Sequence, residues 1–199
     1  IMKDDPNTLV STEWLKANQQ DPNIRILDAS WHMPSDGRDA SNEFVNGHIL
    51  NARFFDIDDI SDHRSTLPHM VPPVEKFMSR VRALGVGDGH RIIVYDTKGL
   101  FSAARVWWLF RLMGHNSVAV LDGGLPKWIA DGNPLSTTAP IIRDRHMTVK
   151  QQLQMVRDVT QVAHAAKLND HEIIDARSGT RFIGEAPEAR TGLRSGHIP

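Results

Sequence analysis

Cysteine is absent from the 199 residues, so the chain as written holds no disulfide, no thiolate metal site and no cysteine nucleophile. It also lacks an excess of charge of either sign, because 23 lysines and arginines face 24 aspartates and glutamates. Proteins that bind nucleic acids or membrane surfaces through charge need a basic excess, so neither partner is expected. No apolar run reaches the roughly 18 residues that a membrane span requires.

The first residues, Ile1 to Pro6, contain no apolar run typical of a secretory signal, which favours a cytoplasmic location. The chain is 40% hydrophobic and 24% charged, which is ordinary for a globular protein and excludes wholesale disorder. A chain of this size buries about 70% of the surface that its unfolded form exposes. We therefore expect a self-supporting core.

Alternating apolar patterns predict the fold class. Short segments rich in branched residues predict buried strands at 24–29, 52–57, 91–96 and 117–122. Helical patterns cover 11–18, 74–84 and 102–113, and a short helix carries Trp128. Ser11 is predicted to cap the first of these helices. This alternation predicts an α/β fold, a three-layer sandwich with a central, mainly parallel sheet.

Two segments of the chain repeat each other. Asp28-Ala29 recurs as Asp175-Ala176, and Gly47-His48-Ile49 recurs as Gly196-His197-Ile198, in the same order and at similar spacing. We therefore expect a first domain at 1–135, a polar linker at 136–150 and the opening part of a second such domain at 151–199. That second part is predicted to hold a helix near 156–168 and a strand at 172–176.

Longer motifs carry a family resemblance over nearly the whole chain. They include Leu27-Asp28-Ala29-Ser30-Trp31, Leu67-Pro68-His69-Met70, Gly99-Leu100-Phe101-Ser102, Leu121-Asp122-Gly123-Gly124-Leu125-Pro126, Arg181-Phe182 and Pro187-Glu188. Together they resemble the rhodanese superfamily, and within it the tandem-domain sulfurtransferases that use 3-mercaptopyruvate.

The resemblance implies transfer of sulfur from 3-mercaptopyruvate or thiosulfate to cyanide or to an acceptor thiol, such as a thioredoxin-like protein. It implies a cysteine persulfide and no cofactor or metal. The nucleophile position after the strand at 91–96 is occupied here by Asp96, so the first domain is expected to be catalytically silent. The cysteine is expected in the second domain beyond Pro199, and the 199-residue chain alone is expected to be inactive.

The same resemblance points to supporting site residues. Arg181 and Arg190 match positions linked to the substrate carboxylate, which paired guanidinium donors suit; alternatively they are ordinary surface arginines. Asp58 and His69 match a pair proposed to support proton transfer. Alternatively, Asp58 caps a turn in an aspartate-rich loop and His69 only packs against its neighbouring prolines.

Other prominent residues have structural interpretations. Ser102 is predicted to cap the following helix, and Arg105 to form an ion pair at the contact between the domains. His48 and His197 are interpreted as structural turn residues. The glycine-rich stretch at 85–89 precedes a strand instead of following one, so it is not a nucleotide loop. The rival hypothesis is a catalytically inactive binding or regulatory module, which the coding sequence beyond Pro199 would distinguish from an enzyme.

Overall fold

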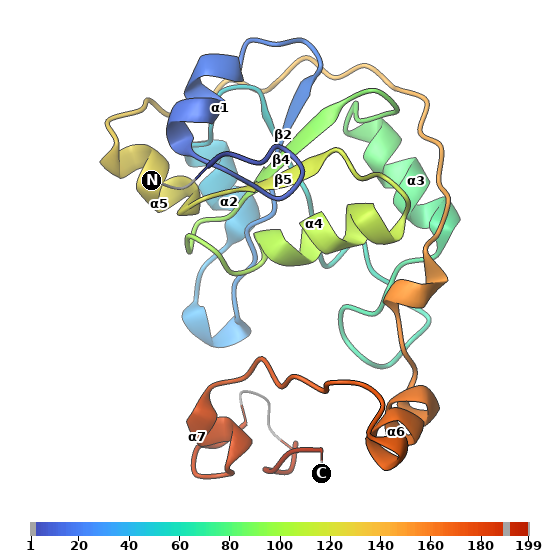
Figure 1. The fold of residues 1–199 in the computed structure, drawn as a ribbon. Coiled ribbons are helices and arrows are strands. Elements are labelled where there is room, and N and C mark those ends of the chain that lie inside the picture. The colour runs from blue at the N-terminus through green and yellow to red at the C-terminus, as the bar shows by residue number, and fades with distance from the viewer. Residues whose placement is uncertain (1–2, 189–191, 199) are drawn as a thin grey trace. The chain divides into compact units, whose positions relative to one another are not determined.

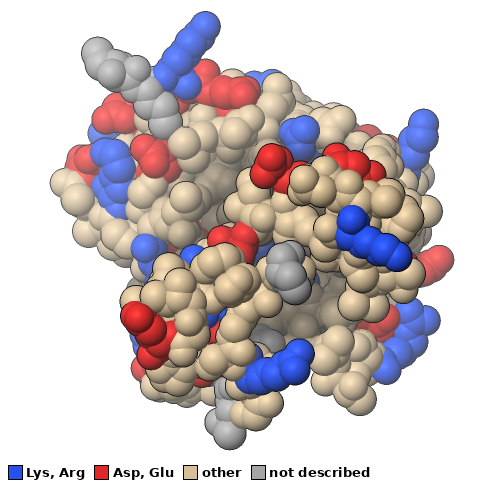
Figure 2. Space-filling model, turned by 60° about the horizontal axis from the view of Figure 1, so that its bottom comes forward, with Lys and Arg blue, Asp and Glu red and all other residues tan. Residues whose placement is uncertain are grey.

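The computed structural model describes residues 3–188 and 192–198 and divides the chain into two compact units, Ile1–Leu153 and Gln154–Pro199. Arg190 lies outside the described residues. Lysines and arginines are interspersed with acidic residues on the face shown in Figure 2, in keeping with the balanced net charge. No helix in the described part of the chain is long and apolar enough to cross a membrane.

The first unit is built on a parallel sheet of five strands in the order β1-β5-β4-β2-β3. The strands are β1 (Leu9–Val10), β2 (Ile24–Asp28), β3 (Ala52–Phe54), β4 (Arg91–Tyr95) and β5 (Val118–Leu121). The four predicted strands and the α/β class are confirmed. The sequence did not predict β1, because two residues are too few to show a strand pattern.

Helices cover both faces of this sheet (Figure 1). One face carries α1 (Thr12–Asn18), α2 (Ala40–Asn46) and α5 (Gly124–Ala130), and the other carries α3 (Val74–Ala83) and α4 (Ala103–Leu112). Ser11 caps α1 as predicted, since its Oγ accepts the Trp14 N–H at 3.1 Å. The sequence analysis did not predict α2. This helix has few apolar residues, and one of them, Val45, is exposed, so it shows no clear apolar face.

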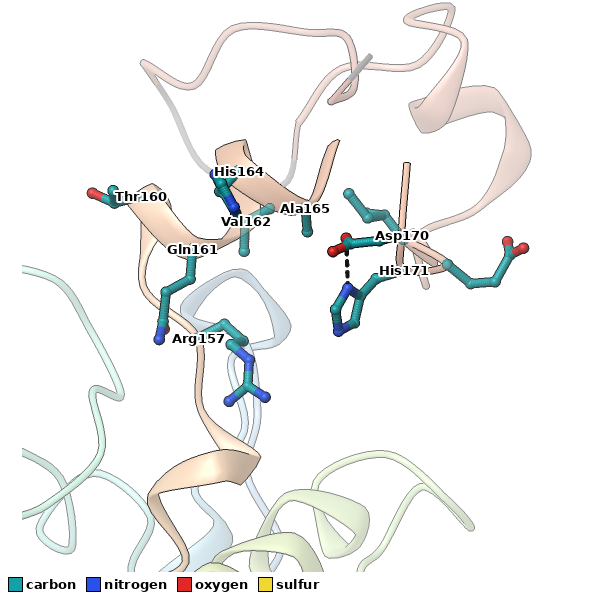
Figure 3. A pocket seen from close by; sticks show the side chains of 10 residues that line it. Arg157, Thr160, Gln161, Val162, His164, Ala165, Asp170 and His171 are labelled. Carbon is teal, nitrogen blue, oxygen red and sulfur yellow. Dashed lines mark hydrogen bonds and ion pairs between the residues drawn. The ribbon is translucent and has the colours of Figure 1, made fainter. Parts of the chain in front are cut away.

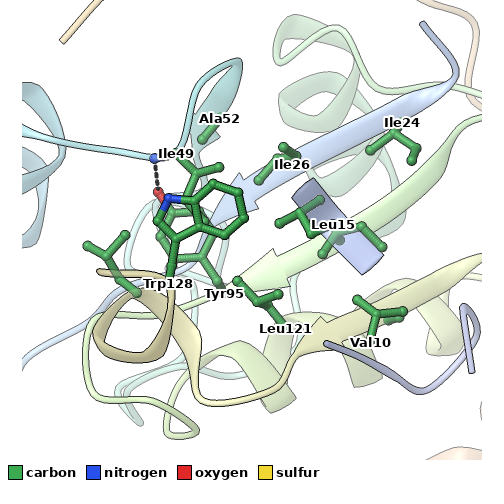
Figure 4. Close-up of a cluster of buried hydrophobic side chains, with 12 residues drawn as sticks. Val10, Leu15, Ile24, Ile26, Ile49, Ala52, Tyr95, Leu121 and Trp128 are labelled. Atoms are coloured by element: carbon green, nitrogen blue, oxygen red, sulfur yellow. Dashed lines mark hydrogen bonds between the residues drawn. The ribbon is translucent and has the colours of Figure 1, made fainter. Parts of the chain in front are cut away.

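The core has two layers. On the first face, the buried rings of Tyr95 and Trp128 pack among aliphatic side chains of β2, β4 and β5 (Figure 4). The Tyr95 hydroxyl accepts the Ile49 N–H at 3.3 Å, so its polar end is satisfied. On the second face, the Phe110 ring lies 5.2 Å from Phe77. The sheet is therefore buried on both sides, which explains its continuous apolar strands.

Residues 136–150 contain no helix or strand, but they pack against the first unit. Met147 is buried, and the Lys150 N–H donates to the Met113 carbonyl at 3.0 Å. Thr148 contacts Asp88 through its Oγ1 at 2.6 Å. The boundary between the compact units accordingly falls after Leu153.

The second unit holds the end of a short 3₁₀ turn, η2 (Leu153–Met155), then α6 (Val159–Leu168) and α7 (Gly179–Phe182). A capping box begins α6: the Asp158 side chain accepts the Gln161 N–H at 2.8 Å, and the Gln161 side chain accepts the Asp158 N–H at 2.9 Å. The predicted strand at 172–176 is wrong for the described residues. A strand exists through hydrogen bonds to a neighbouring strand, and this unit's described residues supply none.

Candidate active site

Asp58 and His69 are brought together on the loop after β3. The His69 Nε2 lies 2.7 Å from Asp58 Oδ1. A carboxylate accepts the proton of the nearer ring nitrogen, so it fixes the hydrogen on Nε2 and leaves Nδ1 as the basic nitrogen. The loop lies beyond the carboxyl ends of the parallel strands, where α/β sheets place their ligands.

Trp31 completes this pair. It follows β2 by three residues, and its Nε1–H donates to both carboxylate oxygens of Asp58 at 3.1 Å. The edge of its ring meets the His69 ring at 4.9 Å, and its face stacks near Phe101 at 6.4 Å. The sequence analysis listed Trp31 only as part of a motif. Its place just after a strand that ends in Asp-Ala was the available signal.

The other aspartates of the loop have separate partners. Asp56 caps the local turn, since its Oδ1 accepts the Asp59 N–H at 3.0 Å. Asp59 pairs with Arg80, whose guanidinium lowers the pKa of that carboxyl. The turn-capping role considered for Asp58 therefore belongs to Asp56, and the Asp58 side chain is left to His69 and Trp31.

Arg105 on α4 contacts the backbone of His69. Its Nη2 donates to the backbone carbonyl of His69, whose φ of 57° is unusual for a residue with a side chain. Burial lowers the pKa of Arg105. Among the described residues Arg105 makes no ion pair, so the predicted ion pair is not present there. The arginine instead fixes the backbone that carries the imidazole.

Two hollows border the pair. One of about 390 Å³ is lined by the loop from Asp58 to His69, including Ser61 and Thr66. The other, of about 340 Å³, is lined by Trp31, His32 and again Asp58. Asp58 thus lies between two openings, which gives small molecules access to its neighbourhood.

Asp96 occupies the end of β4 with its side chain turned inward, 1% exposed. Its Oδ1 accepts the Lys98 N–H at 2.9 Å, and its Oδ2 accepts the N–H groups of Phe101 and Ala103 at 2.7 and 2.9 Å. Ser102 stands at the start of α4, but its side chain makes no capping bond, so the predicted cap was assigned to the wrong residue. The amides at the start of α4, those of Phe101 and Ala103, donate to the Asp96 carboxylate instead.

In the second unit, Arg181 lies in α7 and pairs with the nearly buried Glu188. Arg177 joins the same carboxylate at 2.6 Å and also binds Asp175, whose pKa it lowers to about 2. The Arg181 guanidinium lowers the pKa of Glu188. The structure thus places Arg181 in a charge cluster, while its predicted companion, Arg190, lies outside the described residues.

The two Gly-His-Ile segments make the same local contacts. His48 Nδ1 lies 2.8 Å from the Phe44 carbonyl, and its ring stacks on Phe44 at 4.2 Å. His197 Nδ1 lies 2.8 Å from the Phe182 carbonyl, and its ring stacks on Phe182 at 3.9 Å. Both histidines therefore fix a turn against an aromatic ring, in agreement with their structural interpretation.

The second unit also has an open pocket of about 740 Å³ beside α6 (Figure 3). Its wall includes Arg157, Val162 and the hydrogen-bonded pair Asp170 and His171, whose Oδ1 and Nδ1 are 2.7 Å apart. Within residues 3–188 and 192–198, no group of three histidine or acidic side chains could hold a metal ion.

Residues 11–131 match the profile of the rhodanese-like domain. The chain belongs to the rhodanese family. Thiosulfate/3-mercaptopyruvate sulfurtransferase 1, mitochondrial, of Arabidopsis thaliana is 42% identical over 96% of the chain and 56% of its own length. The 3-mercaptopyruvate sulfurtransferase of Escherichia coli K12 is 42% identical over 96% of the chain and 68% of its length.

Two solved structures share the fold of this chain. The crystal structure of SseA from Escherichia coli, described as a 3-mercaptopyruvate sulfotransferase with the rhodanese fold, matches with a TM-score of 0.86 and 41% identity. The match covers 96% of this chain and 72% of SseA. Tum1 from Saccharomyces cerevisiae matches with a TM-score of 0.83 and 30% identity over 96% of this chain and 67% of its own. The family and fold predicted from the motifs are confirmed.

Proposed function

We propose that the whole protein is a sulfurtransferase that moves sulfur from 3-mercaptopyruvate, in preference to thiosulfate, to a thiol or cyanide. The relatives' names support the reaction class, since the chain is similar to 3-mercaptopyruvate and thiosulfate sulfurtransferases. The observation that carries the donor preference is the pair of His69 and Asp58 at 2.7 Å, because only the mercaptopyruvate reaction needs a proton moved from sulfur to carbon.

The proposed step begins with a cysteine thiolate, which the 199 residues do not contain and the rest of the protein would supply. The thiolate attacks the thiol sulfur of 3-mercaptopyruvate and forms the new S–S bond as the C–S bond breaks. The electron pair goes to the methylene carbon, giving the enolate of pyruvate. His69 Nδ1 accepts the thiol proton and returns it to that carbon, leaving a persulfide for the acceptor thiolate or cyanide to take.

Arg181 and Arg190 are proposed to bind the donor's carboxylate. Two guanidinium groups can hold a carboxylate through paired N–H donors. Arg181 already shares Glu188 with Arg177, so a substrate would use the donors that Glu188 leaves. Arg177 also pairs with Asp175 and Glu188, and the Arg181 side chain is 32% exposed with a buried Nε that has no hydrogen-bond partner.

The domain arrangement belongs to the same proposal. We propose that 1–135 is a complete but silent rhodanese-like domain, that 136–150 links it, and that 151–199 opens a second, catalytic-type domain. The shared histidine–phenylalanine contacts of His48 and His197 support the tandem arrangement. Asp96 supports the proposal that the first domain is catalytically inactive. Its carboxylate already accepts the backbone N–H groups that would otherwise stabilise a persulfide.

The test uses a protein of the relatives' full length and measures pyruvate release and thiosulfate turnover. His69→Gln is expected to lower kcat for 3-mercaptopyruvate by roughly 10²-fold, as loss of a general base does, and to leave thiosulfate turnover nearly unchanged. His146→Gln, on an exposed side chain, is the matched control. Equal loss with both donors, or faster wild-type turnover of thiosulfate, would contradict the proposal.

The 199-residue chain itself is expected to show no sulfur transfer above buffer. Transfer by a purified, cysteine-free sample would contradict the persulfide mechanism. If the full-length protein also lacked a reactive cysteine, the inactive binding module would be the better interpretation. A thioredoxin-like acceptor and a cytoplasmic location stay predictions, and one relative carries the word mitochondrial in its name.

A further inference from the structure

Cationic side chains gather at the amino-terminal edge of the sheet, opposite the edge that carries Asp58 and Asp96. Arg25 lies on β2, and Arg53 lies on β3 opposite Leu27. Residues 25 and 27 point to the same face of β2, so Arg25 and Arg53 are diagonal neighbours about 8 Å apart by strand geometry. Both guanidinium groups reach back toward the start of their strands, to the carbonyls of Pro22 and Asn51 at 2.7 Å.

Both arginines are buried, at 9% and 8% exposure. Arg25 is largely satisfied, because its Nε donates to Gly85 at 2.9 Å and its Nη1 donates to two carbonyls. Arg53 is not, because its buried Nε has no hydrogen-bond partner. Within the described residues, the Nη2 atoms of both arginines also make no hydrogen bond.

No carboxylate neutralises these charges among the residues that the structure describes: their ion pairs include neither Arg25 nor Arg53, and Arg145 forms none either. The charges next to them are cationic. Burial, together with the nearby Arg25, lowers the pKa of Arg53 to about 10. An unpaired buried charge is costly, and proteins normally pair it or bind a counter-ion.

The neighbouring loop adds a further donor. His90 Nδ1 accepts the Gly87 N–H at 3.0 Å, so the neutral ring carries its hydrogen on Nε2. Burial and the surrounding arginines lower the pKa of His90 to about 4, so this ring is a neutral donor near neutral pH. Gly87 also allows the backbone of Arg145 and His146 to approach, since a Cβ there would lie 2.3 Å from the His146 carbonyl.

We propose that Arg25, Arg53, Arg145 and the Nε2–H of His90 form a binding site for a small tetrahedral oxyanion of the sulfate or phosphate class. The anion would accept from the unsatisfied guanidinium N–H groups and supply the negative charge that the protein lacks there. The site is separate from the Asp58–His69 pair, because it lies at the other end of the strands. Its occupancy does not depend on the proposed sulfur chemistry.

The test titrates the 199-residue chain with sodium sulfate and, separately, sodium phosphate, with sodium chloride holding the ionic strength constant. The arginine Nε–H signals are followed by NMR. Saturable shifts of the Arg25 and Arg53 signals are expected, with Arg64 unmoved because it already pairs with Asp62 on the surface. Chloride alone producing the same shifts would overturn the proposal, and the tighter of the two anions identifies the preferred ligand.

Two variants give a second readout. Arg53→Met is expected to weaken sulfate binding at least tenfold and, without sulfate, to raise Tm by removing an unpaired buried charge. Arg145→Gln changes an exposed side chain, so folding is preserved, and it is expected to weaken binding several-fold. Arg64→Met is the matched control. Unchanged sulfate affinity in either Arg53→Met or Arg145→Gln would overturn the site.

Discussion

Asp96 Oδ2 accepts the Ala103 N–H at 2.9 Å, so a side chain at the end of β4 caps α4. The same side chain also accepts the backbone N–H groups of Lys98 and Phe101, so the intervening loop closes around a buried acceptor. We expect Asp96→Ala to lower the free energy of unfolding by about 3 kcal/mol or more, because one buried and two partly buried amide N–H groups lose their acceptor.

The matched control for Asp96 is Asp122, which follows β5 as Asp96 follows β4. In the described structure the Asp122 carboxylate accepts no hydrogen bond, so Asp122→Ala is expected to change stability by less than about 1 kcal/mol. Urea unfolding followed by tryptophan fluorescence measures both variants. Similar losses for the two would show that the Asp96 cap contributes little.

Two glycines offer a second comparison. Gly124 has a φ of 55°, and a Cβ there would lie 2.5 Å from the Asp96 carbonyl. Gly132 has a φ of 73° with open space around it. Gly132→Ala is expected to cost about 1 kcal/mol for its backbone conformation alone, and Gly124→Ala at least about 3 kcal/mol because of the added clash. Thermal unfolding distinguishes the two, and equal costs would contradict the close approach.

His90 makes stability depend on pH. Its pKa is about 4 in the folded chain against 6.5 normally, so between these values the unfolded chain binds a proton that the folded chain does not. The free energy of unfolding should therefore fall as pH drops from about 6.5 to about 4. His115, whose pKa is also lowered by burial, adds to the same trend.

His90→Asn tests this assignment, since its side-chain oxygen can still accept the Gly87 N–H. Denaturant titrations in chloride buffer should show a flatter pH dependence for the variant, while the exposed His146→Asn keeps the wild-type slope. A wild-type slope in His90→Asn would rule out His90 as its source.

Trp31→Phe addresses the proposed proton transfer in a protein of full length. The variant keeps a ring beside His69 but removes the single indole N–H that donates to both carboxylate oxygens of Asp58. We expect kcat for 3-mercaptopyruvate to fall roughly tenfold, as loss of a positioning hydrogen bond does, with thiosulfate turnover little changed. Trp107→Phe removes an indole donor that binds only backbone carbonyls, and it is the control.

The sequence predicted features that local patterns determine. The four predicted strands are rich in buried branched or aromatic residues, and Ser11 stands directly before a helical pattern, so both were recognisable. The α4 cap was not, because Asp96 reaches Ala103 through a loop closure that only the fold creates. The prediction of a strand at 172–176 failed for the opposite reason. Its local pattern is typical of a strand, but the described residues supply no neighbouring strand for it to hydrogen-bond with.

The candidate site shows the same division. Asp58 and His69 were found through motifs, and they lie only eleven residues apart in the same loop. Trp31 lies three residues after β2 and Arg105 lies in α4, and only the packing of the fold brings both of them to His69. Arg105 was expected to pair with a carboxylate, but its nearest acceptor is a backbone carbonyl that no sequence pattern reveals.

The order of the sheet also sets when the first unit can be completed. Within the sheet, Leu9 and Val10 of β1 pair with Val120 and Leu121 of β5, which lies more than 100 residues later in the chain. During synthesis this opening segment must stay unpaired until almost the whole unit has left the ribosome, which is a slow, long-range closure. Because β1 has only two residues, it exposes few unpaired backbone N–H and C=O groups to other chains while it is unpaired. Its short length therefore limits aggregation of the nascent protein.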